Sequence, residues 1–186
     1  MEPLPEETEL DGVVVRRWVP ADASALHDAV VANVEHLRPW MAWIRFEPMT
    51  VPERCSLITE WEQAWRDGGD IVLGIWRDGQ VVGGCGLHRR VGPGGLEIGY
   101  WVHVDHIGQG IATTAARAVT DLAFTAADID RVEIHHDVAN ETSSRIPEKL
   151  GYLVIDDVAS PRDEAAPAET GIDRVWRTTR SQWLAG

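Results

Sequence analysis

The sequence predicts an α/β (α+β) fold in which a mixed, mostly antiparallel sheet of six to seven strands carries helices on both faces. Two observations support this prediction. Strand patterns joined by tight turns come first, and strand–helix–strand units follow, so the predicted order is β-α-α-β-β-β-α-β-α-β-β. The 186 residues are enough to bury one core, and no linker long enough to split them is visible. We therefore expect a single domain over residues 1–186, with residues 1–11 as a flexible acidic leader.

Each element is predicted from local patterns of apolar, β-branched and turn-forming residues. Thr50 is a predicted N-cap, Asp78-Gly79 is a hairpin turn that demands positive φ, and Gly151 ends a helix. Helices are expected to open at Pro20, at Thr50, after Gly110 (running to about Ala127) and at Asn140. Strands are expected at 13–19, 71–76, 80–88, 96–102, 131–137, 152–158 and 172–178, with a short tail after the last.

Charge and composition narrow the classes of function. The formal net charge of −13 argues against direct binding of nucleic acid, which needs clustered Lys and Arg, and it is compatible with a cationic acceptor such as an amine. No apolar run approaches the roughly 20 residues of a membrane helix, and the acidic, Pro-rich N-terminus is unlike a signal peptide. We therefore expect a cytoplasmic protein with no membrane partner.

Cysteine and histidine patterns predict no metal site. Cys55 and Cys85 are too few for a Cys-based metal site or a disulfide framework. Adjacent His135 and His136 lie on a predicted strand, so their side chains point to opposite faces and do not easily bind one ion. One of the histidines at 103, 106, 135 and 136 could still help to deprotonate an amine.

The most informative segment is Gly108-Gln109-Gly110-Ile111-Ala112-Thr113, which follows a predicted strand and opens a predicted helix. The first turn of a helix leaves about four N–H groups without partners, and glycines let a ligand approach the backbone. The segment thus suits an anion such as a diphosphate. A dinucleotide-binding fingerprint is less well supported, because its third glycine is Thr113 here. A plain turn is the remaining interpretation.

Three blocks in this order resemble the general N-acetyltransferase (GNAT) superfamily, and within it the RimJ/RimL-like ribosomal-protein acetyltransferase branch. The first block is Leu96–Val102 (LEIGYWV), and the second is Gly108–Thr113 (GQGIAT). The third is Asn140–Tyr152 (NETSSRIPEKLGY), and Leu37–Trp43 (LRPWMAW) matches a Trp-bearing segment of the branch. The resemblance covers about residues 10–180.

The resemblance implies acetyl-CoA as acetyl donor and a sheet splayed into a V between its fourth and fifth strands. It implies that the backbone of Trp101 and Val102 contacts the pantetheine and the thioester carbonyl. Asn140 and Ser143 would also contact the cofactor, while the diphosphate would be held by Gly108, Gln109, Gly110, Ile111, Ala112 and Thr113. The sequence departs from the superfamily pattern at Ile107, where Gln or Arg is usual, and at Pro147, where many members have Tyr.

Direct attack of an amine on a thioester needs a base for the amine and a proton for the thiolate. Ser143 is the candidate acid, although it could equally be a polar residue of the first helical turn. Glu97 is the candidate base, with an ion pair to Arg89 or Arg131, or a water chain in place of a single base, as the alternatives. Because they lie in a turn that borders the acceptor cleft in this branch, Trp40 and Trp43 are candidates for acceptor binding.

The expected function is acetyl-CoA-dependent N-acetyl transfer to a primary amine. The acceptor is either the N-terminal amine of a ribosomal protein or peptide, or a small-molecule amine, which the Trp-rich segment favours slightly. A non-catalytic acyl-CoA-binding sensor on the same scaffold is the main alternative, and a dinucleotide-dependent oxidoreductase is a distant one. Homodimers are common in this branch, and the sequence leaves the oligomeric state open.

Overall fold

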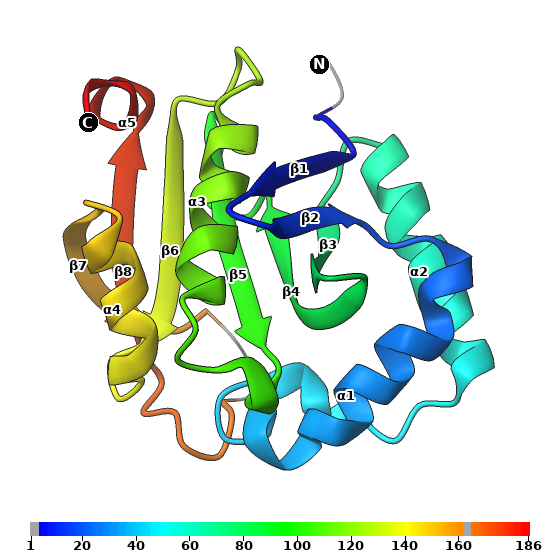
Figure 1. Cartoon of the computed structure of the whole chain (residues 1–186). Coiled ribbons are helices and arrows are strands. Elements are labelled where there is room, and N and C mark those ends of the chain that lie inside the picture. The colour runs from blue at the N-terminus through cyan, green and yellow to red at the C-terminus, as the bar shows by residue number, and fades with distance from the viewer. Residues whose placement is uncertain (1–3, 162–164) are drawn as a thin grey trace.

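The fold is built on one mixed sheet in the computed structural model, which describes residues 4–161 and 165–186. Within these residues the sheet has eight strands in the order β1-β2-β3-β4-β5-β6-β8-β7, and only the β5–β6 pair is parallel (Figure 1). The strands are β1 (Glu7–Leu10), β2 (Val13–Arg17), β3 (Ile71–Arg77), β4 (Gln80–His88), β5 (Gly95–Val102), β6 (Arg131–Asp137), β7 (Leu153–Ala159) and β8 (Ile172–Thr179).

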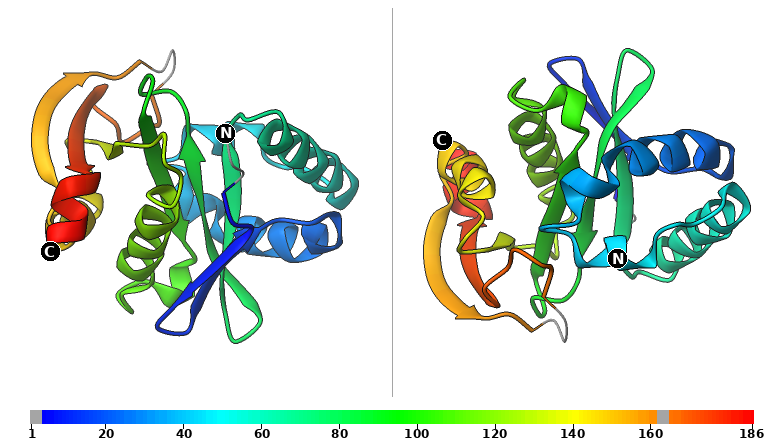
Figure 2. Two further views of the ribbon diagram at one scale, coloured as in Figure 1. Left: turned by 90° about the horizontal axis from the view of Figure 1, so that it is seen from above. Right: turned by 90° about the horizontal axis from the view of Figure 1, so that it is seen from below.

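Helices cover both faces of the sheet, as the sequence predicts (Figure 2). One face carries α1 and α2, and the opposite face carries α3 and α4. The helices are α1 (Ala23–Leu37), α2 (Val51–Arg66), α3 (Ile111–Ala123), α4 (Glu141–Lys149) and α5 (Arg180–Ala185), with short 3-10 turns η1 (Pro20–Asp22), η2 (Ala42–Phe46) and η3 (Val104–His106).

The local signals for helix starts and turns are confirmed. The Thr50 side chain accepts a hydrogen bond from the backbone N–H of Glu53, and the Glu53 carboxylate accepts one from the N–H of Thr50. This capping box satisfies two of the free donors at the start of α2. Asp78 and Gly79 have φ values of 51° and 75°, as a two-residue hairpin turn between β3 and β4 requires.

Both ends of the chain differ from the sequence prediction. The prediction of a flexible leader is wrong for residues 7–10. These residues form β1 and give the sheet one strand more than expected. Strand β1 forms because residues 11 and 12 both adopt positive φ, which turns the chain back onto β2. The prediction of a short tail after β8 is also wrong, because Thr179 and Gln182 form a capping box that starts α5. Residues 1–3 of the expected leader lie outside the described residues.

The sheet separates two apolar cores. Side chains of β5 that alternate along the strand, such as Leu96 and Ile98, pack with Ile111 and Val119 of α3. The other face packs against α1 and α2 through Leu26, Ile58 and the two indole rings of Trp18 and Trp76. Each face of β5 therefore has its own environment, and the residues between Leu96 and Val102 belong alternately to one or the other. In the described part of the chain, no helix is long and apolar enough to cross a membrane.

Candidate active site

The parallel strands β5 and β6 separate before they end. Their paired residues run from Gly95 opposite Arg131 to Ile98 opposite Ile134, and the ladder stops there. The remaining residues, 99–102 of β5 and 135–137 of β6, diverge toward the bottom of the view (Figure 1). This separation agrees with the V-shaped sheet that the resemblance implies. It leaves the backbone of Val102 unpaired toward β6, whereas the backbone groups of Trp101 point toward β4, where Trp101 pairs with Gly84.

The segment that opens α3 lies just beyond the diverging end of β5. Gly108 and Gly110 have φ values of 74° and 79°, a backbone region that favours glycine. The first helical hydrogen bond is from Thr114 N–H to the Gly110 carbonyl, and Gly110 caps the helix without a side-chain bond. In the described residues the backbone N–H groups from Gly108 to Thr113 have no hydrogen-bond acceptor. The helix thus presents a cluster of free donors, and Gly108, Gln109 and Gly110 are exposed.

One cation reaches this segment from another strand. The Arg77 guanidinium at the end of β3 donates to the Gln109 side-chain oxygen at 3.2 Å, and Gln109 Nε2 donates to the Asp105 carbonyl at 3.3 Å. Ile107, which replaces the usual polar residue of the superfamily, is 53% exposed. Arg77 therefore provides a positive charge beside the free N–H groups. The sequence pattern of residues 108–113 does not reveal this charge, because Arg77 comes from a different strand.

Helix α4 brings Asn140 and Ser143 to the diverging strands. The Asn140 side-chain oxygen accepts a hydrogen bond of 3.1 Å from Ser143 N–H, so Asn140 caps the helix. The Tyr100 hydroxyl of β5 donates to the Ser143 carbonyl at 3.3 Å and thereby joins β5 to α4 across the gap in the ladder. Burial raises the pKa of Tyr100, which keeps this hydroxyl protonated. Pro147 is buried inside α4 and has no N–H to donate.

Glu97 is an ion-paired residue on the α1/α2 face. Both of its carboxylate oxygens bind Arg90, and its side chain is 6% exposed. The sequence predicts Arg89 or Arg131 as the ion-pair partner of Glu97 if Glu97 is not the base. The partner in the structure is Arg90 instead. His135 Nδ1 lies 3.6 Å from the Glu97 carboxylate. Glu97 thus lies among charged groups that fix its orientation.

A row of polar side chains crosses four neighbouring strands on this face. His88 is opposite Glu97, Glu97 is opposite Glu133, and Glu133 is opposite Arg177. Burial would raise the pKa of Glu133, but hydrogen bonds from His135 and Arg177 outweigh burial and lower it. The row therefore keeps the buried Glu133 carboxylate ionised next to the point where β5 and β6 part.

His135 and His136 face opposite sides of β6, as the alternation of a strand predicts. His135 Nε2 is 2.7 Å from Glu133, whereas His136 Nε2 accepts from the Trp176 indole at 2.9 Å. His136 Nδ1 then donates to the Asp137 carbonyl at 2.9 Å, so both ring nitrogens are engaged. Burial lowers the pKa of His136. In the described residues no group of three or more His, Cys, Asp or Glu could hold a metal ion.

The Trp-bearing segment lies beside the loop between β7 and β8. The Ala168 N–H donates to the Pro39 carbonyl at 3.0 Å, and the Trp43 and Trp101 rings are 6.4 Å apart. Trp40 and Trp43 are both half-buried. The segment thus joins β5 and the β7–β8 loop on the α1/α2 face, at the end of the sheet where β5 and β6 diverge.

Two buried polar residues that the sequence analysis did not single out fix the loops around this region. The Asp137 carboxylate at the end of β6 accepts hydrogen bonds from the N–H groups of Ala139, Thr170 and Gly171. Asn33 of α1 binds the chain just after β5. Buried polar residues such as these give no distinct sequence signal, because their partners are far away in the chain.

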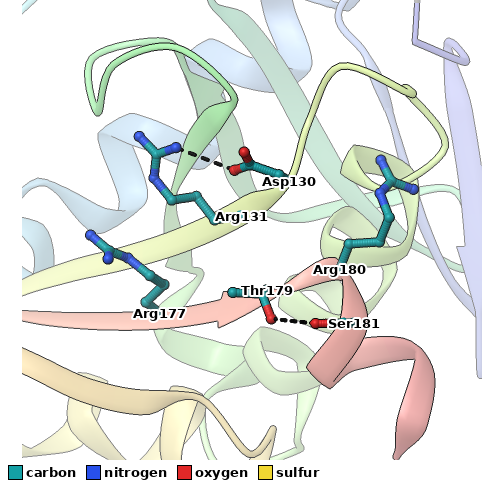
Figure 3. Close-up of a pocket in the computed structure, with 6 residues that line it drawn as sticks. All are labelled: Asp130, Arg131, Arg177, Thr179, Arg180 and Ser181. Carbon is teal, nitrogen blue, oxygen red and sulfur yellow. Dashed lines mark hydrogen bonds and ion pairs between the residues drawn. The ribbon is translucent and has the colours of Figure 1, made fainter.

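A broad hollow of about 710 Å³ lies at the other end of the sheet, where β6 begins and β8 ends (Figure 3). Its guanidinium groups are already engaged, since Arg131 binds Asp130, Arg177 binds Glu133, and Arg180 binds the carbonyls of 124, 126 and 129. The free N–H groups and the diverging strands are at the opposite end, so we assign the candidate site there and not to the hollow.

The fold and the free donors at the α3 start agree with those of an acetyltransferase, and comparison with known proteins shows the class. The family model of the acetyltransferase (GNAT) domain matches residues 13–153, and the chain belongs to this family. The chain is 31% identical over 143 residues to the protein named "Putative ribosomal N-acetyltransferase YdaF" of Bacillus subtilis (strain 168). The matched residues cover 76% of this chain and 78% of YdaF.

Solved structures show the same fold. The microcin C7 self-immunity acetyltransferase MccE, in complex with acetyl-CoA and AMP, has a TM-score of 0.83 at 17% identity, covering 95% of this chain and 98% of that one. The ribosomal L7/L12 alpha-N-protein acetyltransferase RimL, in complex with coenzyme A, has a TM-score of 0.81 at 17% identity, covering 95% and 97%. The likeness to RimJ/RimL-like proteins inferred from the sequence is thus confirmed.

Proposed function

We propose that this acetyltransferase moves the acetyl group of acetyl-CoA to a primary amine by direct attack on the thioester. The observation that carries the proposal is the cluster of free N–H groups from Gly108 to Thr113 beside the parted strands. Free donors at a helix start suit a diphosphate because the helix dipole adds a positive potential. Arg77 adds a full positive charge to the same place.

The parted strands supply the second part of the site. Beyond Ile98 the N–H and carbonyl groups of β5 on the β6 side no longer belong to the ladder, so the backbone of Val102 is available to the amide groups of pantetheine. A backbone N–H at this position would stabilise the negative charge that develops on the thioester oxygen. Asn140 and Ser143 border the same space from α4.

The reaction needs two proton transfers. The ammonium group has three protons and the amide product keeps one, so one proton goes to a base and one to the thiolate as the C–N bond forms and the C–S bond breaks. Ser143 is proposed to deliver the thiolate proton. Pro147, at the position where many members of the superfamily have Tyr, has no proton to donate. Glu97 stays a candidate for the base, although its two oxygens already bind Arg90.

The acceptor is proposed to be the N-terminal amine of a protein or peptide. The names of YdaF and RimL support this choice, since both refer to ribosomal substrates. A small amine is the second candidate, supported by the half-buried Trp40 and Trp43 and by the self-immunity role in the name of MccE. The net charge of −13 favours a cationic acceptor of either kind.

Binding and turnover test the proposal separately. A thermal-shift comparison of acetyl-CoA, coenzyme A and NAD should show stabilisation by the first two, by about 2.7 kcal/mol at a hundredfold excess over Kd. Release of free thiol should then depend on adding a peptide with a free α-amine or a small primary amine. Stabilisation by NAD alone would refute the site, and tight acetyl-CoA binding without thiol release with any amine would identify the sensor instead.

A further inference from the structure

His88 forms a pair with Asp70 at the edge of the polar row. Its Nδ1 is 2.8 Å from Asp70 Oδ2, and Asp70 Oδ1 accepts from the backbone N–H of Arg89 at 2.8 Å. The carboxylate is thus fixed by two donors, and it sets the His88 tautomer with the proton on Nδ1. The Nε2 atom is then a proton acceptor with a free lone pair.

The Nε2 atom is open and lies over the neighbouring strands β4 and β5. In the described part of the chain this atom has no hydrogen-bond partner and is open to solvent. A β-carbon built on Gly86 would lie 2.9 Å from Nε2, and one on Gly99 would lie 3.5 Å away. Gly99 is the first residue of β5 beyond the last parallel pair. The glycines thus provide the space for this ring over β4 and β5, next to the residue at which β5 leaves the parallel ladder.

We propose that His88 accepts the proton that the amine loses when it attacks the thioester, and that Asp70 positions the His88 ring. This inference rests on the proposed acetyl transfer. Nε2 takes one proton from the ammonium group, and this frees the electron pair that forms the C–N bond as the C–S bond breaks. The nitrogen gives its second proton to the thiolate by way of Ser143, and the imidazolium returns its proton to solvent.

The other titratable groups on this face are less suited to the role. Both Glu97 oxygens bind Arg90, and His135 has one nitrogen on Glu133 and the other 3.6 Å from Glu97. His136 points to the opposite face of the sheet. An acceptor whose lone pair is free reacts without first breaking an ion pair, and the Asp–His arrangement is the same one that orients a catalytic base in other enzymes.

The test compares His88→Ala with His88→Gln, Asp70→Asn, Glu97→Gln and His135→Gln in the full chain. Thiol release is followed with a peptide carrying a free α-amine or with a small primary amine, whichever the wild-type protein accepts. We expect His88→Ala to lower kcat about a hundredfold or more while the Kd of acetyl-CoA stays within about twofold. Added imidazole should restore part of the activity of His88→Ala but not of His88→Gln, whose side chain fills the space. The exposed His36 of α1 provides the matched control, and His36→Ala should match wild type.

Asp70 is tested as a positioning residue. Asp70→Asn should lower kcat about tenfold with an unchanged KM for the amine, and Asp70→Glu should recover part of the loss. A kcat for His88→Ala within about threefold of wild type would overturn the inference, as would a hundredfold loss confined to Glu97→Gln or His135→Gln. A wild-type protein that releases no thiol with any amine would instead refute the proposed function, and the inference would fall with it.

Discussion

The side-chain oxygen of Asn33 accepts a hydrogen bond of 2.6 Å from the backbone N–H of Val104, across 71 positions of the chain. Asn33 is completely buried in α1, and its amide nitrogen donates to the Ala29 carbonyl at 2.7 Å. Val104 begins the short turn that leads from β5 to the α3 start. One buried side chain therefore couples α1 to the loop that presents the free N–H groups.

Replacing Asn33 should weaken acetyl-CoA binding, although Asn33 is not among the residues proposed to contact the cofactor. Asn33→Leu leaves the Val104 N–H without its partner, which costs about 1 to 3 kcal/mol of unfolding free energy. Because the turn before α3 loses its anchor, the Kd of acetyl-CoA should rise several-fold. Urea unfolding and calorimetric titration measure the two effects, and an unchanged Kd would show that the loop is held independently of α1.

Gly110 should be essential for the diphosphate site. Its φ of 79° makes Gly110→Ala cost about 1 to 2 kcal/mol, and the altered backbone should weaken acetyl-CoA binding at least tenfold. Gly68 has a nearly identical φ of 78° at the end of α2, and an added β-carbon meets nothing within 4 Å at either glycine. Gly68→Ala should therefore lose similar stability and keep its affinity. Equal losses of affinity in both variants would contradict the site.

Ser143 should act on the leaving thiolate and not on binding. Its backbone N–H and carbonyl bind Asn140 and Tyr100, and these bonds survive the loss of the hydroxyl. Ser143→Ala should lower turnover at least tenfold while the affinity for acetyl-CoA stays nearly intact. Steady-state kinetics and direct titration distinguish the two quantities, and unchanged turnover would remove Ser143 from the mechanism.

Trp40 should contact the acceptor. Trp40→Ala should raise the KM of the amine more than the KM of acetyl-CoA, because Trp40 is proposed to bind the acceptor and not the cofactor. The comparison variant is Trp61→Ala on α2, because Trp61 packs against the α1/α2 core and its loss should affect both constants through the fold. Equal changes in both KM values for Trp40→Ala would indicate a folding defect.

Asp137 should make stability depend on pH in the acid range. Burial would raise the pKa of Asp137, but hydrogen bonds from Ala139, Thr170 and Gly171 outweigh burial and lower it. A group with a lowered folded-state pKa stabilises the fold above its unfolded pKa of about 4, and this contribution disappears as pH falls through the lower value. The difference in unfolding free energy between wild type and Asp137→Asn should be constant between about pH 5 and 7. It should shrink below about pH 4, and a difference that grows with acid would refute the assignment.

Much of the fold could be predicted because its signals are local. The Asp78-Gly79 turn, the Thr50 cap and the Gly110 helix start each depend on a few consecutive residues, and all three appear where the sequence places them. The candidate site was predicted less completely. The Arg90 partner of Glu97, the Asn33 anchor and the Arg77 charge depend on segments that come together only in the folded chain.

The pairing of Asp70 with His88 shows most clearly what the sequence left open. The hairpin turn alone pairs Trp76 with Val81 and would bring Asp70 level with Leu87. A β-bulge after Val81 shifts the register by one residue, so that Ile71 pairs with Leu87 and Asp70 meets His88. The sequence by itself determined the elements, their order and the segment that suits an anion. The tertiary structure decided which polar side chains share a face, because a single extra residue in a strand reverses the side on which every later neighbour lies.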